Sequence, residues 1–221
     1  MSRFDPSFDQ LPDVLPIFPL AGALLLPRGH LPLNIFEPRY LNMIEDALAG
    51  ERMVGMIQPD DTAPTVAGEP GVFPIGCAGR LVNFEETDDG RFLITLKGVS
   101  RFTVTEELAT IRGYRKVAAD WTAYAGDLGP EPPVGFDRTA LMTALRSYFK
   151  LQGIKANWDA LSETPDERLV TSLSMICPFE PSEKQALLEA ADLAERAEIL
   201  KTLVQMAALD SGSDDSHKAR Q

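Results

Sequence analysis

Histidine and cysteine are residue types well suited to nucleophilic or acid–base chemistry, and outside the C-terminal tail the chain has His30, Cys77 and Cys177. A histidine acts as a general base only beside a nucleophile or an orienting carboxylate, and the sequence alone places neither next to His30. The two cysteines lie far apart, without the close spacing of a zinc site or a redox pair. We therefore interpret them as buried free thiols, and we predict no catalytic residue, no metal site and no cofactor site.

The motifs that mark common enzyme classes are missing from the sequence. It contains no G-x-x-x-x-G-K-[ST] phosphate loop, no G-x-G-x-x-G dinucleotide fingerprint, no G-x-S-x-G nucleophile elbow and no H-E-x-x-H zinc motif. We predict a non-catalytic protein. The alternative is an enzyme of unrecognised type that uses Cys77 or His30.

The composition excludes several partners. The chain has 221 residues, a formal net charge of −12 and a pI near 4.6, whereas binding to nucleic acid or to an anionic membrane needs a basic face. Residues 15–41 are almost wholly apolar, but five prolines interrupt them and exclude a membrane-spanning helix. The acidic N-terminus does not resemble a secretory signal. We therefore expect a cytoplasmic protein with no nucleic-acid or membrane partner.

The elements that must position any site begin in this apolar stretch. Residues 15–20 and 31–36 are short apolar runs bounded by Gly and Pro, which is typical of strands, and Arg28-Gly29 is the expected turn between them. Pro38 favours the start of a helix, which Gly50 should end in a left-handed conformation. Residues 52–59 form the next expected strand.

Residues 75–86 and 91–98 flank Thr87-Asp-Asp-Gly90 and predict a hairpin. The Asp-Gly pair suits a tight turn, and Phe92, Ile94 and Leu96 alternate on one face. We expect Arg101, further along the same strand, to pair with the acidic residues of this hairpin. Residues 14–124 are thus predicted to form an antiparallel β-rich lobe, a pseudo-barrel with one inserted helix.

Residues 125–136 are rich in Gly and Pro, and beyond them the apolar period becomes helical. Asp137 is a candidate N-cap, Gly153 a terminator, and capping boxes are expected to begin at Thr164, Ser182 and Asp192. The sequence predicts an α+β protein in five parts: a flexible N-terminus (1–13), the β-rich lobe (14–124), a linker (125–136), a bundle of about four helices (137–209) and a disordered tail (210–221).

Three blocks of the sequence carry recognisable patterns. In LPIFPLAGALLLPRGHLPLNIFEPRYLNMIEDAL, a P-L strand, a proline turn and a P-L-x-I-F strand lead into a helix. IGCAGRLVNFEETDDGRFLITLKGVSRFTV holds G-x-x-G-R, D-G-R and G-x-x-R-F through Gly76, Gly79, Arg80, Asp89, Gly90, Gly98, Arg101 and Phe102. EPSEKQALLEAADLAERAEILKTLV holds K-Q-x-L-L-E and R-x-x-x-L through Lys184, Gln185, Leu187, Leu188, Glu189, Arg196 and Leu200. In this order, the blocks closely resemble the N-terminal, substrate-binding domain of the ATP-dependent protease Lon.

The resemblance implies a stand-alone, bacterial, ATP-independent domain, without the ATPase and Ser-Lys peptidase domains that follow in Lon. In Lon this region helps to recognise unfolded or tagged substrates and supports assembly, and it offers no catalytic residue to transfer. The β-rich lobe also resembles part of cereblon, an adaptor. We therefore expect a protein-binding module for unfolded or partly folded polypeptide, an adaptor or a chaperone-like protein. A regulator that contacts Lon or its partners is the alternative.

Peptide binding requires an exposed apolar patch or an open sheet edge. Phe36, Arg39, Tyr40 and Met43 are the candidate peptide-binding residues, because the strand-to-helix corner could present aromatic, arginine and methionine side chains together. The alternative is that these four side chains only close the lobe.

Overall fold

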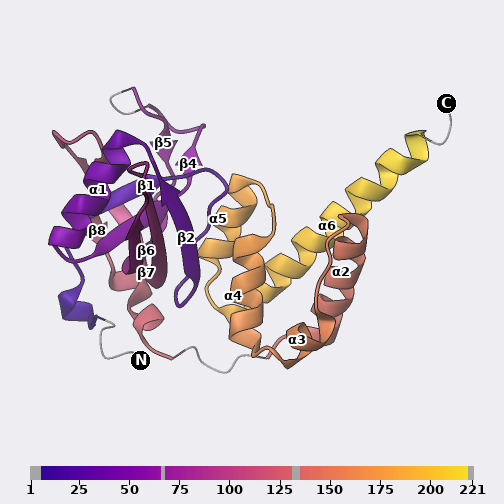
Figure 1. Cartoon of the computed structure of the whole chain (residues 1–221). Helices are drawn as coiled ribbons and strands as arrows, with labels where there is room; N and C mark the ends of the chain where they lie inside the picture. The colour runs from indigo at the N-terminus through magenta and orange to yellow at the C-terminus, as the bar shows by residue number, and fades with distance from the viewer. Residues whose placement is uncertain (1–5, 66–67, 131–134, 219–221) are drawn as a thin grey trace.

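The computed structural model describes residues 6–65, 68–130 and 135–218. It has the predicted α+β architecture, with a lobe of β-strands followed by a lobe of helices packed against its side (Figure 1). Parts of the predicted N-terminal segment, linker and tail lie outside the described residues. None of the described helices is both long and apolar enough to cross a membrane.

The first lobe holds a six-stranded sheet in the order β2-β7-β6-β3-β1-β8. Its elements are β1 (Val14–Pro19), β2 (His30–Ile35), α1 (Pro38–Ala49), β3 (Met53–Ile57), β6 (Ile75–Glu86), β7 (Phe92–Leu108) and β8 (Arg115–Asp120), with β4 (Pro59–Asp60) and β5 (Gly71–Val72) as a separate pair. The described pairings are antiparallel, apart from the parallel β1–β3 pair. Because β7 pairs with β2 and β6 and, near its end, with β8, the sheet curls into a loose pseudo-barrel.

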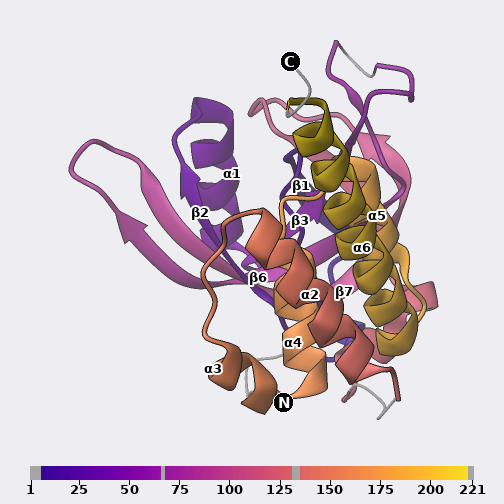
Figure 2. The same ribbon diagram turned by 90° about the vertical axis from the view of Figure 1, so that its right-hand side faces the viewer.

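The β6–β7 hairpin follows the sequence pattern closely. Gly90 has φ +79° in the turn, as the Asp-Gly pair predicts. Phe92 and Ile94 are buried, while Leu93 between them is exposed. Figure 2 shows this hairpin projecting beyond the rest of the lobe.

The connection from β1 to β2 crosses β7 at Gly98. The Arg28 N–H donates to the Gly98 carbonyl (2.9 Å), and the Gly98 N–H donates to the Gly29 carbonyl (2.8 Å). A Cβ at Gly98 would lie 2.0 Å from the Leu26 carbonyl oxygen, so only glycine fits. The predicted turn at Arg28-Gly29 is confirmed, with Arg28 in the left-handed region at φ +65°.

The second lobe contains α2 (Arg138–Leu151), α3 (Trp158–Glu163), α4 (Asp166–Ile176), α5 (Pro181–Glu189) and α6 (Leu193–Lys218). We expected about four helices, and α3 is the additional one; six residues are too few to show a helical period. Among the predicted caps, Asp137 accepts from Ala140 N–H (2.9 Å) and Asp192 from Glu195 N–H (2.9 Å).

Three predicted helix signals are wrong. Thr164 donates its hydroxyl to the Ala160 carbonyl (2.7 Å) and ends α3, so it does not cap α4. The capping box of α5 begins at Glu180, because Pro181 starts that helix before Ser182. After α1, Gly50 has φ −116°, and the left-handed residue is Arg52, whose N–H returns to the Ala47 carbonyl (2.9 Å). In each case another local hydrogen bond, or a proline, determines where the helix begins or ends.

Both chain ends contain regular structure within the described residues. Residues 8–10 form the short helix η1 (Phe8–Gln10), Leu11 is buried, and the Trp121 indole N–H donates to the Pro12 carbonyl (3.1 Å). At the other end α6 continues to Lys218. Its buried stripe reaches Val204, and extending an existing helix needs no new nucleus.

One hydrophobic core runs through both lobes. It includes Ile35, Met43 and Leu96 of the first lobe and Leu145 and Leu200 of the second. A separate core inside the curled sheet is built around Phe102, with Leu15, Ile17 and Trp121. The lobes are therefore packed into one unit.

Arg101 on β7 links the lobes with buried hydrogen bonds. Its Nε and Nη2 donate to the Asp127 carboxylate (2.9 and 2.8 Å), with both side chains less than 10% exposed. Its Nη1 donates to the carbonyls of Leu188 and Ala190 (3.2 and 2.7 Å) at the end of α5. A buried charge must be paired, so these bonds fix β7, Asp127 and α5 relative to one another.

The expected pairing of Arg101 with the acidic hairpin is wrong. The hairpin tip lies at the far end of β7, where Asp89 pairs with Arg91 (2.8 Å). Asp127 belongs to the predicted linker 125–136, whose first residues form part of η2 (Thr122–Leu128). This part of the linker is bound to the β-rich lobe.

We predict that Arg101→Ala lowers the free energy of unfolding by about 3–5 kcal/mol, because it leaves the buried Asp127 charge unpaired. Asp127→Leu alone should have a similar effect, and Arg101→Met combined with Asp127→Leu a smaller one than either. Urea denaturation measures all three. Arg91→Ala, at an exposed pair, is the control and should leave the midpoint unchanged. An unchanged midpoint in Arg101→Ala would show that other contacts hold the lobes.

Candidate functional site between the lobes

A pocket of about 650 Å³ lies between the start of β2 and α4. The first lobe contributes three consecutive residues, and α4 contributes side chains three or four positions apart, which share a helix face. The lining residues are Arg28, Gly29, His30, Pro165, Glu167, Arg168, Thr171, Ser172, Met175 and Ile176. We call this space the seam pocket.

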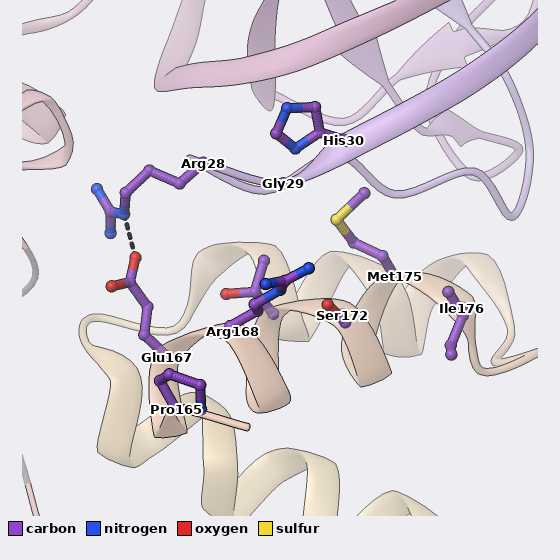
Figure 3. Close-up of a pocket in the computed structure, with 10 residues that line it drawn as sticks. Arg28, Gly29, His30, Pro165, Glu167, Arg168, Ser172, Met175 and Ile176 are labelled. Atoms are coloured by element: carbon purple, nitrogen blue, oxygen red, sulfur yellow. Dashed lines mark hydrogen bonds and ion pairs between the residues drawn. The ribbon is translucent and has the colours of Figure 1, made fainter. Parts of the chain in front are cut away.

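Arg28 and Gly29 set the width of the seam pocket. The Arg28 guanidinium forms an ion pair with Glu167 of α4 and donates to the carbonyls of Asp127 (2.8 Å) and Gly129 (3.2 Å). Met175 projects toward Gly29 (Figure 3), and a Cβ there would lie 2.4 Å from its sulfur. The two walls are thus in contact and held in register.

The seam pocket carries a positive charge on an acidic protein. The Glu167 carboxylate is paired with Arg28. Arg168, in contrast, forms no ion pair or hydrogen bond within the described residues. Figure 3 shows the Arg168 guanidinium in the space between α4 and the strand that bears His30. Both Arg168 and His30 are exposed.

A second pocket, of about 400 Å³, adjoins the first. Its walls are mainly apolar and come from the last turns of α2 and the segment after it, from α3, and from the second half of α4 and the residues that follow it. The lining residues are Phe149, Ile154, Lys155, Ala156, Asn157, Ala160, Leu161, Thr164, Leu173, Ile176, Cys177 and Pro178. Ile176 lines both pockets, although 70% of it is exposed. We call this space the apolar pocket.

The structure separates the four residues predicted at the strand-to-helix corner. Phe36 is 64% exposed. Arg39 is half-buried in ion pairs with Glu37 (3.1 Å) and Glu69 (2.8 Å). Tyr40 and Met43 lie in the core of the lobe, so in this arrangement only Phe36 and Arg39 face outward.

The residues considered for nucleophilic chemistry are not brought together in either pocket. Cys77 is fully buried and lines neither pocket. Burial raises the pKa of its thiol well above the ordinary value, and the nearby Asp127 carboxylate adds to this effect. Burial also raises the pKa of Cys177 to about 11. His30 lines the seam pocket, and no described side chain forms a hydrogen bond or ion pair with it. Among the described residues, no group of three His, Cys, Asp or Glu side chains could hold a metal ion.

Sequence reasoning missed the seam pocket because Arg28 and Arg168 come from distant parts of the chain. The available signal was on α4, where Arg168, Ser172, Met175 and Ile176 recur at helical spacing as a mixed polar and apolar stripe. A stripe of this kind shows a shared face but not what lies opposite.

Comparison with known proteins gives a consistent family. The model of the ATP-dependent protease La (LON) substrate-binding domain matches residues 14–206. The Lon protease of Flavobacterium johnsoniae is 27% identical over 226 residues, covering 96% of this chain and 26% of that protein. Lon protease 2 of Sorangium cellulosum is 34% identical over 107 residues, covering 47% of this chain and 13% of that protein. The chain thus spans about a quarter or less of the length of these relatives.

Two solved structures share the fold. A Lon N-terminal domain protein from Xanthomonas campestris has a TM-score of 0.59 and 22% identity, covering 86% of this chain and 97% of that one. The N-terminal domain of Mycobacterium avium complex Lon protease has a TM-score of 0.57 and 16% identity, with the same coverage. With the family model matching most of its length, this chain belongs to the Lon substrate-binding domain family.

Proposed function

We propose that this protein binds segments of unfolded polypeptide, without chemical change, in the two adjoining pockets along α4. The observation that carries the proposal is Ile176, a large apolar side chain that is 70% exposed and shared by both pockets. Exposed apolar side chains in a groove are typical of binding surfaces. The family model, described as a substrate-binding domain, supports the same function.

Side-chain pockets suit this surface better than strand addition. β2 is an edge strand that pairs only with β7 among the described strands. However, Pro32 lies in its middle and has no N–H to offer an added strand. A bound segment would therefore place its side chains in the pockets, with an apolar one against Ile176.

The corner residues Phe36 and Arg39 are proposed as a second contact surface for a longer segment. Ile35, next to Phe36, pairs with Phe92 of the hairpin. The same hairpin exposes Phe84 and Leu93. Tyr40 and Met43 would support this surface from inside the lobe. Capture at both surfaces would suit an adaptor or a chaperone-like protein.

A non-catalytic role predicts inert cysteines. At pH 8 a thiol-specific reagent should label neither Cys77 nor Cys177 in the native protein, because the thiolate is the reactive form and burial raises both pKa values. Both should react once urea unfolds the chain. Mass spectrometry locates the label, and rapid labelling of native Cys77 would reopen the nucleophile interpretation.

The binding surface is tested by Ile176→Ser. Burying an isoleucine stabilises a complex by about 1.5–3 kcal/mol, so the variant should bind a fluorescent, permanently unfolded polypeptide about tenfold more weakly. Fluorescence anisotropy gives the dissociation constants.

The matched control is Ile111→Ser, which removes an equally apolar and fully exposed side chain far from α4 in the sequence. It should bind like the wild type. Phe36→Ala tests the corner in the same assay. Weakening by Phe36→Ala but not by Ile176→Ser would move the main site to the corner, and absence of binding by the wild type would contradict the proposed function.

A further inference from the structure

We propose that the seam pocket binds a carboxylate of the bound polypeptide, through the side chains of Arg168 and Thr171 of α4. This inference rests on the proposed function and names the class of segment that the site prefers. The preferred segment carries a carboxylate close to an apolar side chain, with the carboxylate in the seam pocket and the apolar side chain in the apolar pocket. The carboxylate can come from an acidic side chain or from a chain terminus.

The first observation is the uncompensated charge of Arg168. Of the charged side chains that line the seam pocket, Arg28 and Glu167 neutralise each other. Arg168 is left without an ionic or hydrogen-bonding partner within the described part of the chain. A guanidinium offers donors in a fork that matches a carboxylate. On a chain with net charge −12, a pocket of this sign stands out as an anion site.

The second observation is the hydroxyl of Thr171. This side chain is only 7% exposed and lines the seam pocket. Within the described residues its hydroxyl makes no hydrogen bond to the protein, so it can donate to a group in the pocket. An anion in the pocket would accept this hydrogen bond. His30, on the opposite wall, adds an N–H donor in either protonation state.

The neighbouring apolar pocket determines which chemical group the ligand should carry next to its carboxylate. Ile176 borders both spaces, so a ligand that fills both must join a carboxylate to an apolar group. Polypeptide provides this combination, either as an acidic residue near an apolar one or as an apolar residue at a free C-terminus. Arg168 comes two turns before Ile176 on the same helix face.

The test uses the full chain and a labelled model peptide in four forms: leucine at a free C-terminus, the same peptide amidated, an internal Asp-Leu pair, and Asn-Leu in its place. Wild type should prefer each carboxylate peptide over its neutral twin by about tenfold. Arg168→Ala should abolish the preference with little change for the neutral peptides, and Arg168→Lys should restore part of it. Lys150→Ala removes the same charge from an exposed site on α2 and should leave the preference intact.

Each outcome decides the proposal. A preference confined to the free C-terminus or to the internal Asp would assign the carboxylate to that source. Equal binding of charged and neutral peptides by the wild type would overturn the carboxylate subsite and leave polypeptide binding standing. A preference that survives Arg168→Ala would place the charge recognition elsewhere and also overturn it. Binding of an unfolded protein but of none of the four peptides would contradict the carboxylate subsite alone. Absence of any binding would contradict the proposed function as well.

Discussion

The buried guanidinium of Arg101 is the interaction on which the arrangement of the two lobes depends. A charge removed from water is tolerated only when its donors are satisfied, and Arg101 finds acceptors at Asp127, Leu188 and Ala190. These acceptors come from two further segments of the chain. Satisfying one side chain therefore brings together β7, the start of the linker and the end of α5. The continuous core across both lobes then keeps them in place.

The seam pocket is a consequence of this arrangement. Lys184 and Gln185 of α5 donate to carbonyls of the first lobe, at Gly22 (2.5 Å) and Ile75 (3.1 Å). With α5 fixed, α4 lies opposite the start of β2, and Arg28 closes one end by pairing with Glu167. The binding surface is thus made by the contact between lobes, while its free groups, Arg168 and Ile176, make no part of that contact.

Local signals in the sequence predicted local structure well. The hairpin turn at Gly90 and the caps at Asp137 and Asp192 depend on neighbours within a few residues. The box predicted at Thr164 was wrong, since its hydroxyl found a closer acceptor in the preceding turn. The candidate site was harder to predict. Helical spacing shows that Tyr40 and Met43 share a region with Arg39, but not which of them the sheet covers, and no local pattern could place Arg28 beside Glu167. The Lon-like motifs indicated part of this contact, because Arg101, Lys184 and Gln185 are among the residues that join the lobes.

The most direct test of the central claim, that the seam between the lobes is the binding surface, is amide hydrogen exchange of the full chain with and without a saturating unfolded polypeptide. Contacts that exclude water and restrict local opening slow exchange. We predict slower exchange in α4 and around residues 28–30, with little change in the β6–β7 hairpin. Slower exchange confined to the hairpin and the corner at Phe36, with α4 unaffected, would contradict the account.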